Sequence, residues 1–347
     1  MMTTAVDSNR KLTVARAVAE AIEIEMKRDP KVFVMGEDIA KLGGVFGNTR
    51  GLLDTFGGDR IRDTPISETA FIGAGVGAAA DGMRPIVELM FVDFFGVCFD
   101  AIYNLAAKQS YFSGGNVHCP MVIMTYAGGG YSDAGQHSQC LWASFAHMPG
   151  LKVVVPSNAY DAKGLMISAI KDNNPVVFIG HKGIQGMGWL GTEQGSVVQV
   201  PEGSYEIPLG VAKVVHKGTD VTIVAVAMSV HHAVTAAQEL AAEGISAEVL
   251  DLRSVVPLDR KAIFESVKKT GRLLVVDEDY SSFSLSSEVI TSVVEQDSTV
   301  LKAAPQRLAY PDVVIPFAPV LEQAALPNAK KIAASVRKMM GKAAADA

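Results

Sequence analysis

The sequence predicts an α/β protein made of two domains, each a mainly parallel sheet covered by helices. Short apolar runs alternate with longer segments in which apolar residues recur every three or four positions, which is the pattern of βαβ units. The chain has 347 residues, which is long for one domain and suits two. A polar, glycine-rich stretch at residues 182–204 shows no strong periodicity and predicts the linker.

The first half of the sequence predicts one complete sheet. We expect helices at residues 12–28, 68–82, 99–113 and 160–170, and strands at 31–35, 85–90, 121–126, 152–155 and 176–180. Residues 37–63 contain many glycines and few apolar runs, so we expect a long loop with a short helix there. Loops of this length in compact domains are usually functional.

The second half predicts a further α/β domain. Residues 221–226, 230–243 and 247–251 form a strand–helix–strand pattern, followed by a strand at 272–277 and a closing helix at 326–340. We therefore predict a first domain at residues 1–185, a linker at 186–207 and a second domain at 208–347.

Composition excludes several classes of partner. The formal net charge of −6 disfavours nucleic acid and anionic membranes, which select for a basic face. No uncharged apolar run approaches the roughly 20 residues that span a bilayer. The N-terminal segment MMTTAVDSNRK lacks the apolar core of a signal peptide. We expect a soluble, cytoplasmic protein in which Cys98, Cys119 and Cys140 are reduced thiols that behave as small apolar residues.

The segment DTPISE, residues 63–68, leads into the helix expected at 68–82. Pro65 favours an extended Thr64, and Ser67 suits the N-cap position. Glu68 then lies in the first helical turn, where the helix dipole favours a carboxylate. Spacing alone allows two interpretations of Glu68, a good first-turn acid or a functional carboxyl group.

Three glycines follow at alternate positions, Gly73, Gly75 and Gly77. Their spacing does not match a dinucleotide fingerprint, which also needs a strand before it and a helix after it. We interpret Gly73 and Gly77 as small residues that permit close helix packing.

His137 lies in the glycine-rich segment AGGGYSDAGQHSQ, residues 127–139, directly after an expected strand. Sites are often built on such loops, and histidine suits proton transfer near neutral pH. A lone histidine is also often structural or merely exposed, so both interpretations stand.

Residues 169–175, AIKDNNP, end a helix before a strand. One interpretation is an ordinary C-cap, in which Asn tolerates left-handed geometry and Pro stops the helix. The other is a cluster of carbonyl and carboxylate oxygens that holds a hard cation.

Several motifs together resemble a known family. They are DTPISE (63–68), VGAAxxGMRPIxELMFxDF (76–94), QHSQ (136–139), PGLKVVxP (149–156) and DAKGL (161–165). In this order they resemble the β subunits of the first components of 2-oxoacid dehydrogenases, a family that includes pyruvate, branched-chain and acetoin dehydrogenases. The resemblance spans about Leu12 to Met340. It implies a thiamine-diphosphate-binding, transketolase pyrimidine-type parallel-sheet domain, followed by a transketolase C-terminal-type α/β domain.

The resemblance also implies roles for individual residues. Glu68 matches the acid that hydrogen-bonds the aminopyrimidine ring of thiamine diphosphate and promotes the imino tautomer, which removes the thiazolium proton. Ile66 and Met90 match residues that line this ring, and Phe94 matches the aromatic side chain that stacks on it. His137 matches the active-site histidine that helps protonate intermediates and pass the acyl group to a lipoyl arm.

The family also implies metal ions and partners. Met121, Ala169, Ile170, Asp172 and Asn174 match a potassium site found in the pyruvate branch. The G-D-G…N-N motif that holds the diphosphate through Mg²⁺ is missing here, since Gly57-Gly58-Asp59-Arg60 has only part of it. In the family this motif lies on the α subunit. The resemblance therefore implies an active site at an α/β interface, two α and two β chains, and a lipoyl-bearing acyltransferase as a further partner.

The small-molecule substrate is less closely defined. The segment ELMFVDFFGVCFD, residues 88–100, most resembles acetoin dehydrogenase β subunits. The short connection from Gly36-Glu37-Asp38 to Gly43-Gly44 resembles pyruvate-type chains instead. We expect acetoin, with pyruvate or another 2-oxoacid as the alternative. A non-catalytic scaffold subunit is the alternative of a different class, and it would not need Glu68, Phe94 and His137 together.

Overall fold

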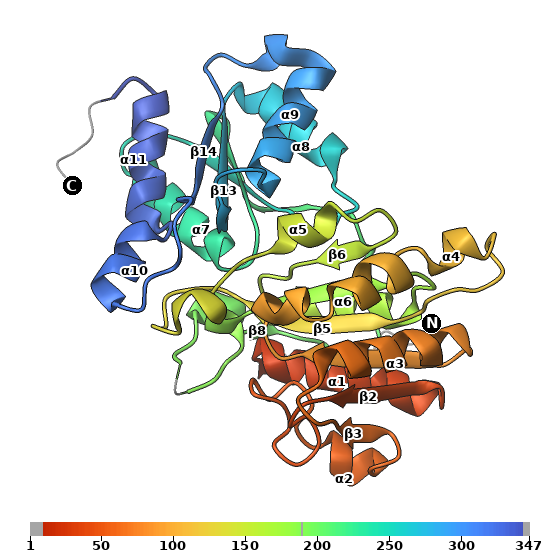
Figure 1. Cartoon of the computed structure of the whole chain (residues 1–347). Coiled ribbons are helices and arrows are strands. Elements are labelled where there is room, and N and C mark those ends of the chain that lie inside the picture. Colours follow the sequence, from red (N-terminus) through yellow and green to blue (C-terminus); the bar gives the residue numbers. More distant parts are fainter. Residues whose placement is uncertain (1–9, 189, 343–347) are drawn as a thin grey trace. The chain divides into compact units, whose positions relative to one another are not determined.

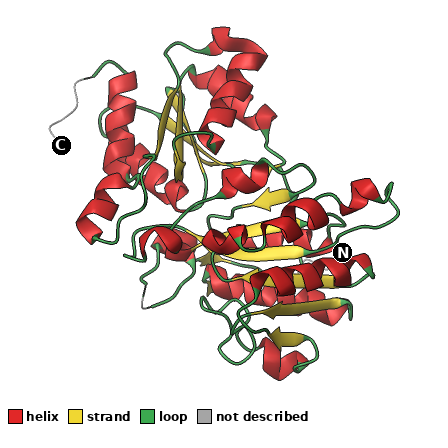
Figure 2. Ribbon diagram, in the orientation of Figure 1, coloured by secondary structure: helices red, strands yellow, loops and turns green. Residues whose placement is uncertain are grey.

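The computed structural model describes residues 10–188 and 190–342 (Figures 1 and 2). The N-terminal segment that lacks a signal-peptide core lies largely outside the described residues. The chain forms two compact units. The first comprises the chain up to Ala127 together with Ser144–Leu209, and the second comprises Gly128–Ala143 together with the chain from Gly210 onward.

The first unit is built on a parallel sheet. Its strands are β2 (Val32–Gly36), β3 (Ile61–Asp63), β4 (Arg84–Leu89), β5 (Val122–Ala127), β6 (Lys152–Val154) and β7 (Val176–His181). They follow the order β6-β7-β5-β4-β2-β3, and every pair in this series is parallel. β2, β5 and β7 are buried along their whole length, as expected for strands covered on both faces.

Helices cover this sheet. They are α1 (Val14–Arg28), α2 (Leu52–Phe56), α3 (Glu68–Ala80), α4 (Gln109–Phe112) and α6 (Ala159–Lys171). α1 packs beside α6, whereas α3 packs on β4. A short antiparallel pair, β1 (Lys11–Leu12) with β8 (Val198–Gln199), lies outside the main sheet. The α5 helix (Trp142–Ala146) leads toward β6.

Two local expectations for the first unit were wrong. The loop expected at 37–63 contains the short α2, as predicted, but it also contains β3, whose three residues are too few to show a periodic pattern. The single helix expected at 99–113 is instead a π-helical turn (Ala101–Ala106) followed by α4. A π-helical turn is rare and has no periodic signature of its own, so the apolar pattern could not distinguish it from an α-helix.

The second unit is built on a five-stranded sheet of order β14-β13-β10-β11-β9. Its strands are β9 (Lys213–His216), β10 (Val221–Ala225), β11 (Ala247–Asp251), β13 (Leu273–Tyr280) and β14 (Gln306–Tyr310), and a short strand, β12 (Ser254–Val256), follows β11 in the chain. All neighbours in this sheet are parallel except β9, which runs antiparallel to β11.

Helices cover both faces of this second sheet. They are α7 (Met228–Ala241), α8 (Arg260–Thr270), α9 (Leu285–Asp297), α10 (Pro319–Ala325) and α11 (Ala329–Met339). Ile223 of β10 packs in one cluster with α7 and α11. The next side chain toward the N-terminus, Thr222, points to the other face, where its hydroxyl lies 2.7 Å from Ser266 of α8.

The closing helix expected at 326–340 begins later. α11 starts at Ala329, where the side chain of Asn328 accepts a hydrogen bond from Lys331 N (3.0 Å). Pro327 comes directly before this cap and separates α11 from α10. Within the described residues, none of the helices combines the length and apolarity that crossing a membrane requires.

Candidate active site

The carboxyl edge of the first sheet brings together residues from distant parts of the sequence. In the parallel register, Gly36 at the end of β2 pairs with Asp63 at the end of β3 and with Glu88 near the end of β4. Chain segments that leave these strands therefore begin at one edge, where sites of open α/β sheets usually lie. The predicted residues Ile66, Glu68, Met90 and Phe94 all follow β3 or β4 within a few positions.

Glu68 is the first residue of α3, as the sequence predicts. Its side chain is half-buried. Ser67 occupies the N-cap position but makes no side-chain capping bond, contrary to expectation. Its hydroxyl donates to the carbonyl of Pro65 instead (3.1 Å). The first turn of α3 therefore keeps amide groups that a ligand or a partner chain could satisfy.

Glu37, directly after β2, is a second carboxyl group at this edge. Burial raises its pKa, and the charges of Glu68 and Asp38 raise it further. Its Oε1 is buried and has no hydrogen-bond partner within the described part of the chain. Glu37 was not among the predicted site residues. The only sequence signal for it was its position after a buried strand at the start of a long loop.

A third carboxyl group, Glu88, lies beneath this edge in a polar cluster. Its side chain is 1% exposed, and burial raises its pKa to about 8. The hydroxyl of Tyr126 donates to Glu88 Oε2 (3.1 Å) and accepts a hydrogen bond from the side-chain amide of Asn48. Glu88 Oε1 has no hydrogen-bond partner among the described residues. The loop that contains Gly44 packs against this carboxyl group, since a Cβ added at Gly44 would lie 3.3 Å from both oxygens of Glu88.

Aromatic and apolar side chains form the rest of this edge. The Phe94 ring lies edge-on to Phe91, with centroids 5.8 Å apart, and Phe91 lies edge-on to Phe46 at 6.0 Å. Phe94 and Met90 are half-buried, whereas Ile66 is 84% exposed. The edge therefore carries apolar and aromatic side chains as well as Glu68.

The segment that carries His137 belongs to the second unit. His137 is half-buried and follows a single 3₁₀ turn, Ala134–Gln136. At the start of the segment, Gly130 N and Ser132 N donate to the carboxylate of Glu322. At its end, the indole of Trp142 donates to Asp277 (2.9 Å).

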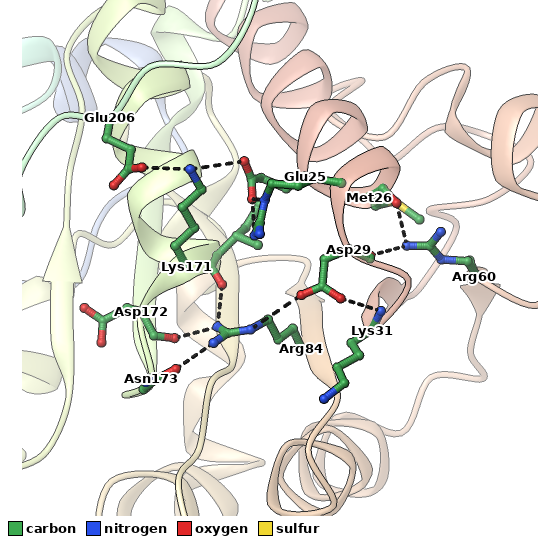
Figure 3. A network of polar contacts seen from close by, with 12 residues as sticks. Glu25, Met26, Asp29, Lys31, Arg60, Arg84, Lys171, Asp172, Asn173 and Glu206 are labelled. Atoms are coloured by element: carbon green, nitrogen blue, oxygen red, sulfur yellow. Dashed lines mark hydrogen bonds and ion pairs between the residues drawn. The ribbon is translucent and has the colours of Figure 1, made fainter.

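The residues predicted to bind potassium lie at the end of α6 and just before β5, at the opposite, amino edge of the first sheet. Figure 3 shows Asp172 of this set beside Arg84 and Asn173. Asp172 caps α6 in an extended conformation, so the left-handed Asn cap is not formed. Arg84 donates to the carbonyls of Ile170 (2.8 Å) and Asp172 (3.0 Å) and to the side chain of Asn173 (2.6 Å). Met121, just before β5, accepts the sheet hydrogen bond of Val176 N (2.9 Å).

The carboxylate of Asp172 already has cationic and amide partners. It is paired with the ammonium group of Lys152, and its Oδ1 accepts from Asn174 N (2.9 Å) and Asn174 Nδ2 (3.0 Å). Burial opposes the charge, but these hydrogen bonds more than offset it, so the pKa of Asp172 is lower than usual. A bound cation would share these oxygens with Arg84 and Lys152.

The cysteines behave as small buried residues, as predicted. All three are buried. Burial raises the pKa of Cys98 and Cys119 to about 12, so these two thiols stay protonated near neutral pH.

Both halves of the chain match known domain families. Residues 10–186 match the transketolase pyrimidine-binding domain, and residues 210–332 match the transketolase C-terminal domain. The structure is also similar to a solved chain described as a split-gene transketolase in an inactive β4 tetramer. The TM-score is 0.76 at 24% identity, covering 95% of this chain and 99% of that one, a likeness that concerns the fold. The protein is thus of the transketolase class, and the predicted fold is confirmed.

Similar proteins of known description define the family within this class. The chain is 48% identical to the β subunit of acetoin:2,6-dichlorophenolindophenol oxidoreductase of Cupriavidus necator, covering 95% of this chain and 98% of that protein. It is 43% identical to the 2-oxoisovalerate dehydrogenase β subunit of Bacillus subtilis (93% and 97% covered). It is also 43% identical to a mitochondrial pyruvate dehydrogenase E1 β subunit of Arabidopsis thaliana (93% and 88% covered). The chain belongs to this family of β subunits of thiamine-diphosphate-dependent 2-oxoacid and acetoin dehydrogenases, as its motifs predicted.

Proposed function

We propose that this chain forms the pyrimidine-binding half of an acetoin-cleaving dehydrogenase component and that a separate α subunit completes the active site. In this proposal the enzyme breaks the C–C bond between the carbonyl and carbinol carbons of acetoin, releases the carbinol half as acetaldehyde and passes the acetyl unit to a lipoyl group of an acyltransferase partner. The lipoyl disulfide is the oxidant and is reduced as the acyl thioester forms. The observation that carries the proposal is the position of Glu68 as the first residue of α3, at the carboxyl edge of the sheet.

The side chains at this edge fit one end of thiamine diphosphate. Phe94, Met90 and Ile66 would contact the flat aminopyrimidine ring, and Glu68 would accept a hydrogen bond from its ring nitrogen. The diphosphate end has no comparable match, because the sequence lacks the G-D-G motif that supplies Mg²⁺ ligands. We assign the Mg²⁺ and the diphosphate to the α subunit. When bound, thiamine diphosphate supplies the carbon nucleophile that attacks the substrate carbonyl.

Glu68 holds and moves a proton in this mechanism. Its carboxyl group would share a proton with the ring nitrogen, donating it as the imino tautomer forms and then accepting the hydrogen bond of the resulting N–H. Glu37 limits how much negative charge gathers here, because burial and the Glu68 charge favour its protonated form. His137 would act in the later steps, as a proton donor to intermediates and in transfer to the lipoyl group.

Surface features of the first unit support a covering partner. Ile66 is 84% exposed although it stands directly before the candidate catalytic residue. Gly73 and Gly77, expected to permit close packing, face open space, since a Cβ added at either would meet no atom within 4 Å. A Cβ on Gly75, in contrast, would lie 2.7 Å from Val87, so of these three glycines only Gly75 is required by packing among the described residues. The open glycines suit the close approach of a helix from an α subunit, in an assembly of two α and two β chains.

The assignment of acetoin rests on the relatives. One relative named for acetoin is 48% identical, and the relatives named for 2-oxoisovalerate and pyruvate are 43% identical. A second relative named for acetoin, from Bacillus subtilis, is 42% identical, so the difference is modest. Pyruvate remains the second candidate, because the connection from Glu37 to Gly44 is short, as in pyruvate-type chains.

A substrate panel on the complex tests the proposal. The chain is co-expressed with the α subunit, and dye reduction is measured with acetoin, pyruvate and 3-methyl-2-oxobutanoate. We expect kcat/KM for acetoin to exceed the others by about tenfold or more, which corresponds to about 1.4 kcal/mol of transition-state discrimination. A preference for pyruvate would transfer the assignment to the second candidate. No turnover with any of the three would favour a scaffold subunit.

A further inference from the structure

The glycine-rich segment Gly128–Ala143, which carries His137, is held by groups of the second unit. The segment closes on itself through Gly128 N, which donates to the carbonyl of Gln139 (3.2 Å). Further contacts come from α10, β13 and the residues near them. Groups from the C-terminal part of the second unit therefore help to fix the conformation of the histidine segment.

Glu322 of α10 makes two of these contacts (α10 is labelled in Figure 1). Its side chain is 0% exposed. Gly130 N donates to its Oε1 (2.7 Å) and Ser132 N donates to its Oε2 (2.9 Å). Hydrogen bonds to an ionised acceptor are stronger than neutral ones, and a buried carboxylate that lost them would be left without compensation. Both oxygens of Glu322 are thus committed to the backbone of this segment.

The segment adopts a backbone conformation that needs such support. Ser132 has φ +60° and Ala134 has φ +59°, values that residues with a Cβ adopt only when the surroundings hold them there. Both lie within five positions of His137. One Glu322 bond ends on Ser132 itself, so the carboxylate acts on the strained part of the segment.

Close packing adds to these bonds. A Cβ on Gly129 would lie 3.3 Å from Leu326, and one on Gly135 would lie 2.7 Å from Val314. Beyond His137, the hydroxyl of Tyr280 donates to the side chain of Gln139 (3.2 Å). His137 therefore lies between two anchors of the same unit.

We propose that Glu322 is a positioning residue for His137, because its buried carboxylate fixes the Gly130–Ser132 backbone from which the histidine turn extends. The proposal rests on the role in acyl transfer proposed above for His137. It assigns a function to the C-terminal domain, whose residues otherwise take no part in the proposed chemistry.

The first experiment measures amide hydrogen exchange by mass spectrometry on the assembled enzyme. In Glu322→Ala, exchange in peptides covering 128–143 should rise about tenfold or more, since two hydrogen bonds to a charged group are lost. Glu322→Gln keeps the volume and one acceptor oxygen, so its increase should be smaller. The matched control is Glu248→Gln, which alters another buried carboxylate of the second unit, bonded to Ser266 (2.6 Å). It should leave exchange in 128–143 at the wild-type rate.

The second experiment is a double-variant cycle on two activities, the dye-linked first half-reaction and the overall lipoyl-linked reaction. We expect His137→Ala to lower the lipoyl-linked activity far more than the dye-linked one, and Glu322→Ala to reproduce this selective loss. Adding Glu322→Ala to His137→Ala should change the lipoyl-linked rate by less than about twofold, because both act through one side chain. A residue that only stabilised the fold would lower both activities and would do so in either background.

Two results would overturn the positioning role. One is wild-type exchange of the 128–143 peptides in both Glu322 variants, and the other is a multiplicative loss in the double variant. A failure of the proposed function would give a different experimental result from these two. If His137→Ala alone kept both activities, the acyl-transfer role of His137 would be wrong and the positioning role would fall with it, while exchange would still decide whether Glu322 holds the segment.

Discussion

Glu68 is the residue whose substitution tests the proposed chemistry most directly. Glu68→Gln keeps the size of the side chain but removes the carboxyl group that would exchange a proton with the ring nitrogen. We expect turnover of the assembled enzyme to fall about 10²–10⁴-fold, the usual contribution of acid–base assistance. Exchange of the acidic proton of bound thiamine diphosphate, followed by quenched-flow NMR, should slow in parallel.

The control for this substitution is another helix carboxylate. Glu23 of α1 pairs only with Lys27 one turn away (2.6 Å) in what is described, and exposed pairs of this kind contribute little. Glu23→Gln should therefore keep wild-type turnover. Proton exchange at the wild-type rate in Glu68→Gln would remove Glu68 from this role.

Glu88 gives a prediction for stability rather than for activity. Its folded-state pKa is about 8, above the ordinary value of 4.5, because the carboxyl group is fully buried. Between these two values the folded protein keeps a proton that the unfolded chain releases. Stability should therefore fall as pH rises through this window, by at most about 1.4 kcal/mol per pH unit for this one group. Above the folded-state pKa the contribution becomes constant.

Glu88→Gln should remove this slope, because an amide does not titrate. In urea unfolding of the assembled protein at pH 5.5, 6.5 and 7.5, the stability of the variant relative to wild type should increase with pH. Any fixed cost of fitting the amide shifts all three values equally. Glu25 is the matched control, a buried carboxylate paired with Arg28 (2.6 Å), whose loss should destabilise at each pH. Parallel pH profiles for Glu88→Gln and wild type would contradict the prediction.

At the scale of secondary structure elements, the junction of α6 and β7 tests the cation proposal. Carbonyl and carboxylate oxygens gather there, and Arg84 and Lys152 already supply positive charge to them. Potassium that binds only the folded state would add stability by linkage, by an amount set by the ratio of its concentration to its dissociation constant. We expect the melting temperature of the assembled protein to be higher in potassium chloride than in equal sodium chloride.

The Asp172→Asn variant provides the comparison for this salt effect. The melting temperature of this variant should be the same in the two salts. The variant should also lose part of the stability that the ion pair between Lys152 and Asp172 contributes. Identical melting curves of the wild-type protein in potassium and sodium would reduce the segment to a helix end held by Arg84.

Elements with strong periodic patterns could be predicted from the sequence, and short or interrupted ones could not. The helix expected at 12–28 is α1 (Val14–Arg28), and the strand expected at 247–251 is β11. β3 has three residues, and only Ile61 is buried, so no pattern marks it. The break between α10 and α11 depends on Pro327, which the apolar periodicity conceals.

The residues of the candidate site also fall into those that the sequence could indicate and those that it could not. Motif resemblance indicated Glu68 and His137, because these residues lie inside contiguous motifs. Glu37 and Glu322 were not found, and Glu88 was given no role although it lies inside a motif, because the significance of all three depends on burial and on contacts distant in sequence. Glu322, for example, bonds to Ser132 across 190 positions.

At the scale of the whole molecule, the chain has the features of one half of an enzyme. Each unit has its own sheet and core, and the two matched domain families cover residues 10–186 and 210–332. The domain boundaries at residues 185 and 208 stay predictions. Side chains such as Ile66 and Val97 leave apolar surface exposed near the candidate catalytic residue, at 84% and 61% of their area. Exposed apolar surface of this kind usually marks an interaction site.

The incomplete set of cofactor ligands leads to the last prediction: this chain alone neither binds thiamine diphosphate tightly nor turns over substrate. Glu68 and Phe94 can hold the pyrimidine end, but the sequence has no motif to coordinate Mg²⁺ at the diphosphate. Charge-assisted and metal contacts are the strong ones, so leaving the diphosphate in solvent forfeits most of the binding free energy. Calorimetry on the purified chain should show no micromolar binding, and adding the α subunit should restore both binding and activity.

A Glu68→Gln chain mixed with the same α subunit serves as the control, since it should regain binding through the diphosphate but little activity. Tight, magnesium-dependent binding by the isolated chain would contradict the interface site and would require a diphosphate site within these 347 residues.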